Sequence, residues 1–149
     1  MLAQSFGSWT LIIILASPAW AAQVEGAAPL DAKGGCPQCR NDSVEIAQLH
    51  KNADRLYAQF KPKEAANELL KIVRLDAQNF EALIKLSRAY IDLGDMIPES
   101  ISDWKERRLK DYQTAEDYAR RAIKANPNST WGYFYLGASL GLTAVVSPV

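Results

Sequence analysis

The chain has 149 residues, a length that suits one domain better than two. Its 17 Lys and Arg residues equal its 17 Asp and Glu residues, so no net charge attracts it to nucleic acid or anionic lipid. One His and two Cys leave few groups for metal binding or nucleophilic catalysis.

The first 21 residues have the pattern of a secretory signal peptide. The apolar run WTLIIILA, residues 9–16, is shorter than the roughly 20 residues that a membrane-spanning helix needs. Ala19 and Ala21 follow it and are the small residues that a signal peptidase accepts. We therefore predict cleavage near Ala21, a periplasmic or secreted protein, and no membrane span in the mature chain. The alternative is an uncleaved membrane anchor, because no Lys or Arg precedes the apolar run.

Residues 22–41 show no apolar period and are rich in Gly, Ala and Pro, which predicts a flexible leader. The leader contains one chemical motif, CPQC, from Cys36 to Cys39. In an exported protein this pair can form a local disulfide, and the alternatives are a labile thiol pair or a metal site shared between chains. Arg40 stands where a haem-attachment motif has His, and no second Cys pair completes a zinc ribbon. We predict no cofactor and no metal site.

Two amphipathic helices are predicted next. Asp42 is placed to cap the first one while Glu45 reaches back to the cap amide. Pro62 suits the first turn of the second. The apolar stripe of the first consists of Ile46, Leu49, Ala53, Leu56 and Phe60, and that of the second of Ala65, Leu69 and Ile72.

Three more helices are predicted after these. The third follows Asn79 and ends at Gly94, a residue suited to the left-handed conformation of a helix C-terminus. The fourth runs from near Ser102 to Lys124, and the fifth begins after Ser129. No stretch alternates with period two for long enough to form a strand, so the predicted fold is all-α. The apolar positions of the third are Leu83, Leu86, Tyr90 and Leu93, those of the fourth Leu109, Tyr112, Ala115, Ala119, Ala122 and Ile123, and those of the fifth Tyr133, Leu136 and Leu140.

The second half of this region is an imperfect copy of the first. KEAANELLKIVRLDAQNFEALIKLSRAY aligns with QTAEDYARRAIKANPNSTWGYFYLGASL, and a small residue recurs in the middle of each following helix. Small side chains let paired helices approach closely. The predicted crossing residues are Ala53, Ser87 and Gly137.

This pattern resembles the tetratricopeptide repeat, a helix–turn–helix unit of about 34 residues. The segments ADRLY, EALIKLSRAY and WKERRLKDYQTAEDYARRAIKANPNSTWGYFYLGASLG resemble the regulator of microtubule dynamics family over 53–141. That family has bacterial relatives, and export makes a microtubule partner implausible, so only the fold carries over. The predicted repeat domain spans 42–142, and a tail follows it at 143–149. Within the domain, repeat 1 covers 46–79, repeat 2 covers 80–129 with an insertion at 96–111, and 130–142 form the first helix of an incomplete repeat 3.

The resemblance to tetratricopeptide arrays implies a concave groove lined by the first helix of each repeat. Exposed aromatic and Arg side chains there are typical interface anchors. The Lys and Asn set that holds C-terminal carboxylates in chaperone-type members is missing, so that ligand is not predicted. Burial of Tyr57, Trp131 and Phe134 between helices is the alternative. The predicted groove residues are His50, Asp54, Tyr57, Glu81, Ile84, Arg88, Trp131 and Phe134.

No constellation of catalytic residues is evident, and we interpret His50 and Asp54 as a solvated polar pair. Residues 130–149 carry no charge, which predicts that further repeats, a partner or a second copy covers this end; the sequence can be a piece of a longer protein. The predicted function is therefore an exported, non-enzymatic scaffold that binds a protein partner. The alternatives are a thiol-redox or metal-handling protein acting through Cys36 and Cys39, and a structural subunit that self-associates through 130–149.

Overall fold

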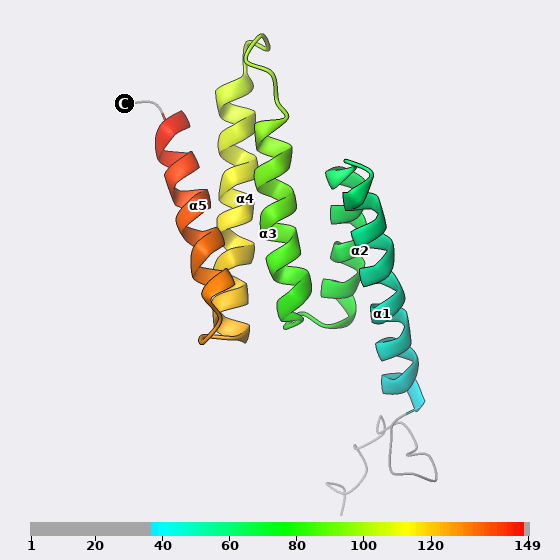
Figure 1. Ribbon diagram of the computed structural model, residues 1–149. Helices are drawn as coiled ribbons and strands as arrows, with labels where there is room; N and C mark the ends of the chain where they lie inside the picture. The colour runs from blue at the N-terminus through cyan, green and yellow to red at the C-terminus, as the bar shows by residue number, and fades with distance from the viewer. Residues whose placement is uncertain (1–36, 148–149) are drawn as a thin grey trace, which may run out of the picture.

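The computed structural model describes residues 37–147, with side chains from residue 41 onward. It contains five α-helices and, within these residues, no strand, which confirms the all-α prediction (Figure 1). Each helix packs against the next one in the chain, and α5 also contacts α3. The predicted signal peptide and Cys36 lie outside the described residues. The helices are α1 (Pro37–Ala58), α2 (Pro62–Leu75), α3 (Phe80–Asp95), α4 (Trp104–Ala125) and α5 (Thr130–Val146).

Helix α1 begins at Pro37, before the predicted start at Asp42. Proline suits the first turn because it lacks the N–H group that would have no helical partner there. Asp42 and Glu45 therefore lie inside the helix, and their predicted role as a capping pair is wrong. The predicted leader is also too long, because residues 37–41 are helical.

The turn between α1 and α2 depends on Phe60, whose φ is 57°. The Lys61 N–H donates to the Leu56 carbonyl at 3.1 Å, the bond that closes a helix when the residue before it is left-handed. A left-handed conformation costs a residue with a Cβ atom about 1–2 kcal/mol. The Phe60 side chain is 90% exposed, so the prediction that it continues the buried stripe of α1 is wrong. Pro62 then opens α2, as predicted.

The turn between α2 and α3 is closed by side chains. Asn79 Oδ1 accepts the Ala82 N–H at 3.1 Å and so caps α3. Asp76 accepts the Gln78 N–H at 3.0 Å through Oδ1 and the Asn79 side-chain N–H at 3.1 Å through Oδ2. These bonds explain why α3 begins immediately after Asn79, as predicted.

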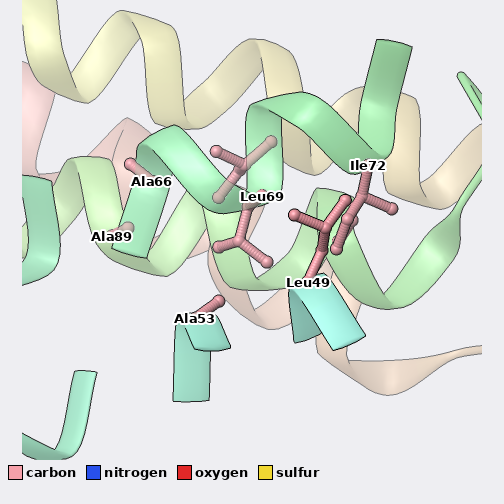
Figure 2. Close-up of a cluster of buried hydrophobic side chains, with 8 residues drawn as sticks. Leu49, Ala53, Ala66, Leu69, Ile72 and Ala89 are labelled. Atoms are coloured by element: carbon pink, nitrogen blue, oxygen red, sulfur yellow. The ribbon is translucent and has the colours of Figure 1, made fainter. Parts of the chain in front are cut away.

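A cluster of apolar side chains joins the first three helices (Figure 2). Leu69 and Ile72 of α2 are buried, as is Leu49 of α1. Burying a side chain of this size stabilises a fold by about 1.5–3 kcal/mol. The small residues of the cluster let the three helices approach closely. The full cluster consists of Leu49, Ala53, Ala66, Leu69, Ile72, Ala82, Leu86 and Ala89.

Helices α3 and α4 approach closely at Ser87. Its hydroxyl donates to the Ala115 carbonyl of α4 at 2.8 Å, and both residues are fully buried. Ala119 and Ala122 continue the buried side of α4. The predicted small-residue contacts at Ala53 and Ser87 are thus confirmed.

Two predictions about glycine are wrong. Helix α3 ends at Asp95, one residue after the predicted end, but Gly94 is helical and not left-handed; it is buried, and its missing side chain leaves room for the ring of Tyr112. Gly137 is exposed, and a Cβ atom placed on it would have no neighbour within 4 Å. The close approach in α5 occurs instead at Gly132, where a Cβ atom would lie 2.8 Å from Cγ1 of Ile123 in α4.

The predicted insertion at 96–111 is only partly a loop. Residues 96–103 connect the helices, whereas α4 begins at Trp104, so the rest of the insertion lengthens α4. Arg108 fixes this connection, because its Nε and Nη2 donate to the Ile97 carbonyl at 3.1 and 2.7 Å.

Helix α5 continues to Val146, past the predicted end at residue 142, so 143–146 of the predicted tail are helical. Its buried residues are Gly132, Ser139 and Val146, whereas Tyr133 and Leu140, two of its predicted apolar positions, are exposed. A helix with apolar residues all round has no stripe that identifies its packed side. Between residues 37 and 147, no helix is long and apolar enough to cross a membrane.

Candidate binding surface

Helices α1, α3 and α5 form a surface with two hollows, which we call the α1–α3–α5 surface. The first hollow, between α1 and α3, has a volume of about 320 Å³. The second, between α3 and α5, has a volume of about 310 Å³. Lys85 and Arg88 line both. The first is also lined by Ala53, Asp54, Tyr57, Ala58, Phe60 and Leu69, and the second by Phe80, Glu81, Ile84, Trp131 and Tyr135.

Arg88 lies between the two hollows with most of its hydrogen-bonding capacity unused. Its guanidinium lies over the ring of Tyr57, 4.4 Å from the centroid, and its Nε is 3.9 Å from Oδ2 of Asp92. That separation is too long for a hydrogen bond, and the guanidinium forms none within residues 37–147. Arg88 can therefore form hydrogen bonds with an acceptor from outside the chain.

Lys85, in contrast, is paired on both sides. Its Nζ is 2.6 Å from Asp54 of α1 and 2.7 Å from Glu81 of α3. Burial opposes the charged form of Lys85, but the bonds to the two carboxylates outweigh it and raise the pKa of its ammonium group above the usual value. Asp54 and Glu81 thus neutralise Lys85 and tie α1 to α3.

The sequence suggested that His50 pairs with Asp54, but the structure shows other partners for both residues. The Nε2 of His50 donates to Oδ1 of Asn79 at 3.2 Å, while its Nδ1 is 3.8 Å from Glu81. His50 thereby links α1 to the cap of α3. It borders a separate depression near the α2–α3 turn and neither of the two hollows. Among the predicted groove residues, its contacts favour a structural role.

Three of the four aromatic residues of α5 are exposed, and Tyr135 is half-buried. Trp131 is 59% and Phe134 57% accessible, so the alternative that these two are buried between helices is wrong. Trp131 stacks on Tyr135 at 6.2 Å between centroids, and Phe134 meets both rings edge-on. Trp131 lines the second hollow, whereas Phe134 lies outside it. Tyr57 is half-buried, and its hydroxyl has no hydrogen-bond partner within the described residues.

Seven residues that line the two hollows are missing from the sequence-based set, and Lys85, Tyr135 and Phe60 are three of them. Lys85 lies one turn after Glu81, so helical spacing alone places it near that carboxylate. Tyr135 lies one turn after Trp131, and the same spacing places it beside the second hollow. No local pattern identifies Phe60, because it lies in a turn whose left-handed conformation usually selects Gly or Asn.

The side chains of this surface include groups that are suited to binding. Within residues 37–147, no three His, Cys, Asp or Glu side chains group to hold a metal ion. The surface offers one guanidinium whose N–H groups form no hydrogen bond within the described residues, two hollows lined by apolar and charged side chains, and exposed aromatic rings. Such features anchor protein and peptide partners.

The structure does not show the arrangement of the other predicted site, the cysteine pair Cys36 and Cys39. Cys36 lies outside the described residues, and of Cys39 only the backbone is described, in the first turn of α1.

Comparison with known families identifies a relationship. A family model described as regulator of microtubule dynamics protein 1-3 matches residues 49–149, which include every predicted groove residue. No curated protein matches the chain significantly.

Proposed function

The chain belongs to the regulator of microtubule dynamics protein 1-3 family, and we propose that it is a non-enzymatic scaffold that binds a protein or peptide on its α1–α3–α5 surface. In this proposal α1 pairs with α2 and α3 with α4 as tetratricopeptide-like hairpins, and α5 is the first helix of a third. The buried small residues Ala53 and Ser87 support this pairing. The first helices of the hairpins then line a groove.

The guanidinium of Arg88, which forms no hydrogen bond within the described residues, carries the proposal. It lies between two hollows and is held by the Tyr57 ring, so little side-chain freedom is lost when an acceptor binds. A carboxylate is the acceptor that best matches a guanidinium in a peptide. We therefore infer a partner segment with an acidic residue flanked by apolar or aromatic side chains, which fill the hollows.

Phe60 supports a role for the first hollow. A residue in the left-handed region with an exposed aromatic ring is held in a strained position without the compensation of burial. An apolar side chain of the partner packed against Phe60 supplies that compensation.

A peptide-display selection tests this function and does not require an identified partner. The wild-type chain is expected to enrich sequences in which Asp or Glu lies next to aromatic or aliphatic residues. The Arg88→Glu variant is expected to lose the acidic preference, because it reverses the charge between the hollows. Selection of no peptides, or of the same acidic peptides by both forms, contradicts the proposal. Circular dichroism of the variant controls for folding.

Export is part of the same proposal and is supported by the apolar run and the small residues before residue 22. The mass of the protein purified from its own cells tests it. Cleavage near Ala21 gives a mature protein that starts close to residue 22. An intact N-terminus in a cytoplasmic fraction contradicts export.

A thiol function is the second candidate, and the position of the α1 start favours it. The helix begins at Pro37, so Cys39 lies in its first turn, whereas Cys36 lies outside the described residues. Helix N-termini stabilise thiolates. Thiol titration and metal analysis of the wild type and of a Cys36→Ser/Cys39→Ser variant test this candidate. A disulfide that resists glutathione, with no bound metal, contradicts it.

A further inference from the structure

One side of α5 is equivalent to a side of α3 that another helix covers. The alignment of the two halves of the chain pairs Leu83, Ser87, Tyr90 and Gly94 of α3 with Tyr133, Gly137, Leu140 and Ala144 of α5. We call the second set the outer face of α5.

In α3 this side packs against α4 along its length. Ser87 is bonded to the Ala115 carbonyl, the ring of Tyr90 stacks on that of Tyr118 with centroids 5.6 Å apart, and Gly94 lies against Tyr112. The alignment therefore shows how the side of α3 that is equivalent to the outer face of α5 packs in the same chain. This side of α3 receives another helix.

In α5 the equivalent side is uncovered. Tyr133 is 53% and Leu140 42% accessible, Ala144 is exposed, and Gly137 has open space around it. No helix within residues 37–147 covers this face, although α5 packs against α4 and α3 on its other sides. Exposed apolar residues gathered on one helix face mark an interaction surface.

We propose that the outer face of α5 binds the outer face of a second copy of this chain, so that two α5 helices pack about a two-fold axis. A two-fold contact brings each central residue close to its own copy, and any charge there meets the same charge. Residues 130–149 carry no charged residue, so the contact is free of this repulsion. Gly137 lets the two helix backbones approach closely.

The composition of α5 distinguishes this occupant from a lipid surface. Helices that lie in the membrane interface carry Lys and Arg on their polar face. Helix α5 has none. The outer face is also separate from the two hollows, because none of its four residues lines them. Self-association and partner binding can therefore be tested independently.

Sedimentation velocity of the full chain between 1 and about 200 µM tests the proposal. The wild type is expected to form a dimer as concentration rises. Gly137→Lys and Gly137→Glu each place like charges at the axis and are expected to weaken the dimer at least about tenfold. The open space around Gly137 lets both variants fold. An equimolar mixture of the two is expected to recover a dimer, because opposite charges then meet.

Gln113→Lys, an exposed change on α4, is the matched control and is expected to leave the dimer intact. Arg88→Ala should also leave it intact, which separates this inference from partner binding. A wild type that stays monomeric over the whole concentration range overturns the proposal, and this holds whether or not the monomer binds phosphatidylcholine vesicles. So does a dimer that persists unchanged in both Gly137 variants, or a mixture of the two that stays monomeric.

Discussion

Gly94 of α3 lies directly against the ring of Tyr112 in α4: a Cβ atom on Gly94 would be 2.5 Å from Cε1 of Tyr112. The Tyr112 hydroxyl donates to Oδ1 of Asp95, the next residue, at 2.7 Å. Ring and hydroxyl together therefore fix the spacing of α3 and α4 near the end of α3. Since α3 also lines both hollows, this contact helps to position the binding surface.

Replacement of Gly94 by Ala tests the contact. In an open helical position Gly→Ala stabilises a protein by about 0.4–1 kcal/mol. At Gly94 the added methyl group must displace the Tyr112 ring, and we expect a loss of about 1–3 kcal/mol in the free energy of unfolding, measured in urea. Gly141→Ala is the control, because nothing lies within 4 Å of its Cβ position, and it is expected to be neutral or stabilising. Equal gains for both variants contradict the contact.

Tyr112 also predicts a pH dependence. Burial and the hydrogen bond to Asp95 raise the pKa of its hydroxyl well above 10.0, the value of an unperturbed Tyr. Above about pH 10 the unfolded chain loses this proton while the folded chain keeps it, so stability falls as pH rises, by about 1.4 kcal/mol per unit. Tyr112→Phe is expected to be less stable at pH 7 and to decline less steeply above pH 10. Parallel declines in alkaline urea titrations contradict this account.

Phe60 predicts that stability and binding change in opposite directions. Phe60→Gly removes a Cβ atom from a left-handed position and is expected to raise the free energy of unfolding by about 1 kcal/mol. The same change removes an exposed ring from the first hollow and is expected to weaken peptide binding. Phe60→Asn is the control, because Asn tolerates the left-handed region and also lacks the ring. Unchanged stability in both variants contradicts the strain.

The link between α1 and α3 can be measured by a double-mutant cycle. Lys85→Met, Asp54→Asn and the pair are compared in urea unfolding at low salt. We expect a coupling of about 0.5–1 kcal/mol, because Asp54 is exposed and Lys85 only partly buried. The coupling should shrink in 1 M salt. If the two changes have additive effects on the free energy of unfolding, a direct interaction between Lys85 and Asp54 is contradicted.

The sequence predicts those parts of the fold that depend on local pattern. The stripes of α2 and α4 and the start of α3 after Asn79 follow from helical spacing and side-chain chemistry, and the buried Ala53 and Ser87 follow from the internal copy. Helix α5 shows where this reasoning fails. It is apolar on every side, so only its contacts with α4 and α3 determine that Gly132 is buried and Gly137 is exposed.

The candidate surface is predictable to a similar degree. Helical register brings Arg88 and Trp131 to one surface, as expected, and correctly leaves Trp131 exposed. Register does not reveal that Lys85 draws Asp54 away from His50, because that choice depends on distances between helices. Nor does it reveal Phe60, whose exposure follows from a turn that local sequence rules do not predict.

The most direct test of the proposed function is the affinity of one selected acidic peptide, measured by fluorescence anisotropy. Arg88→Ala is expected to weaken binding about tenfold or more, and replacement of the peptide's acidic residue by its amide should then add little further loss. Arg74→Ala, an exposed change on α2 away from both hollows, should bind like the wild type. Equal affinity of wild type and Arg88→Ala, or additive losses in chain and peptide, would contradict the binding of an acidic segment at Arg88.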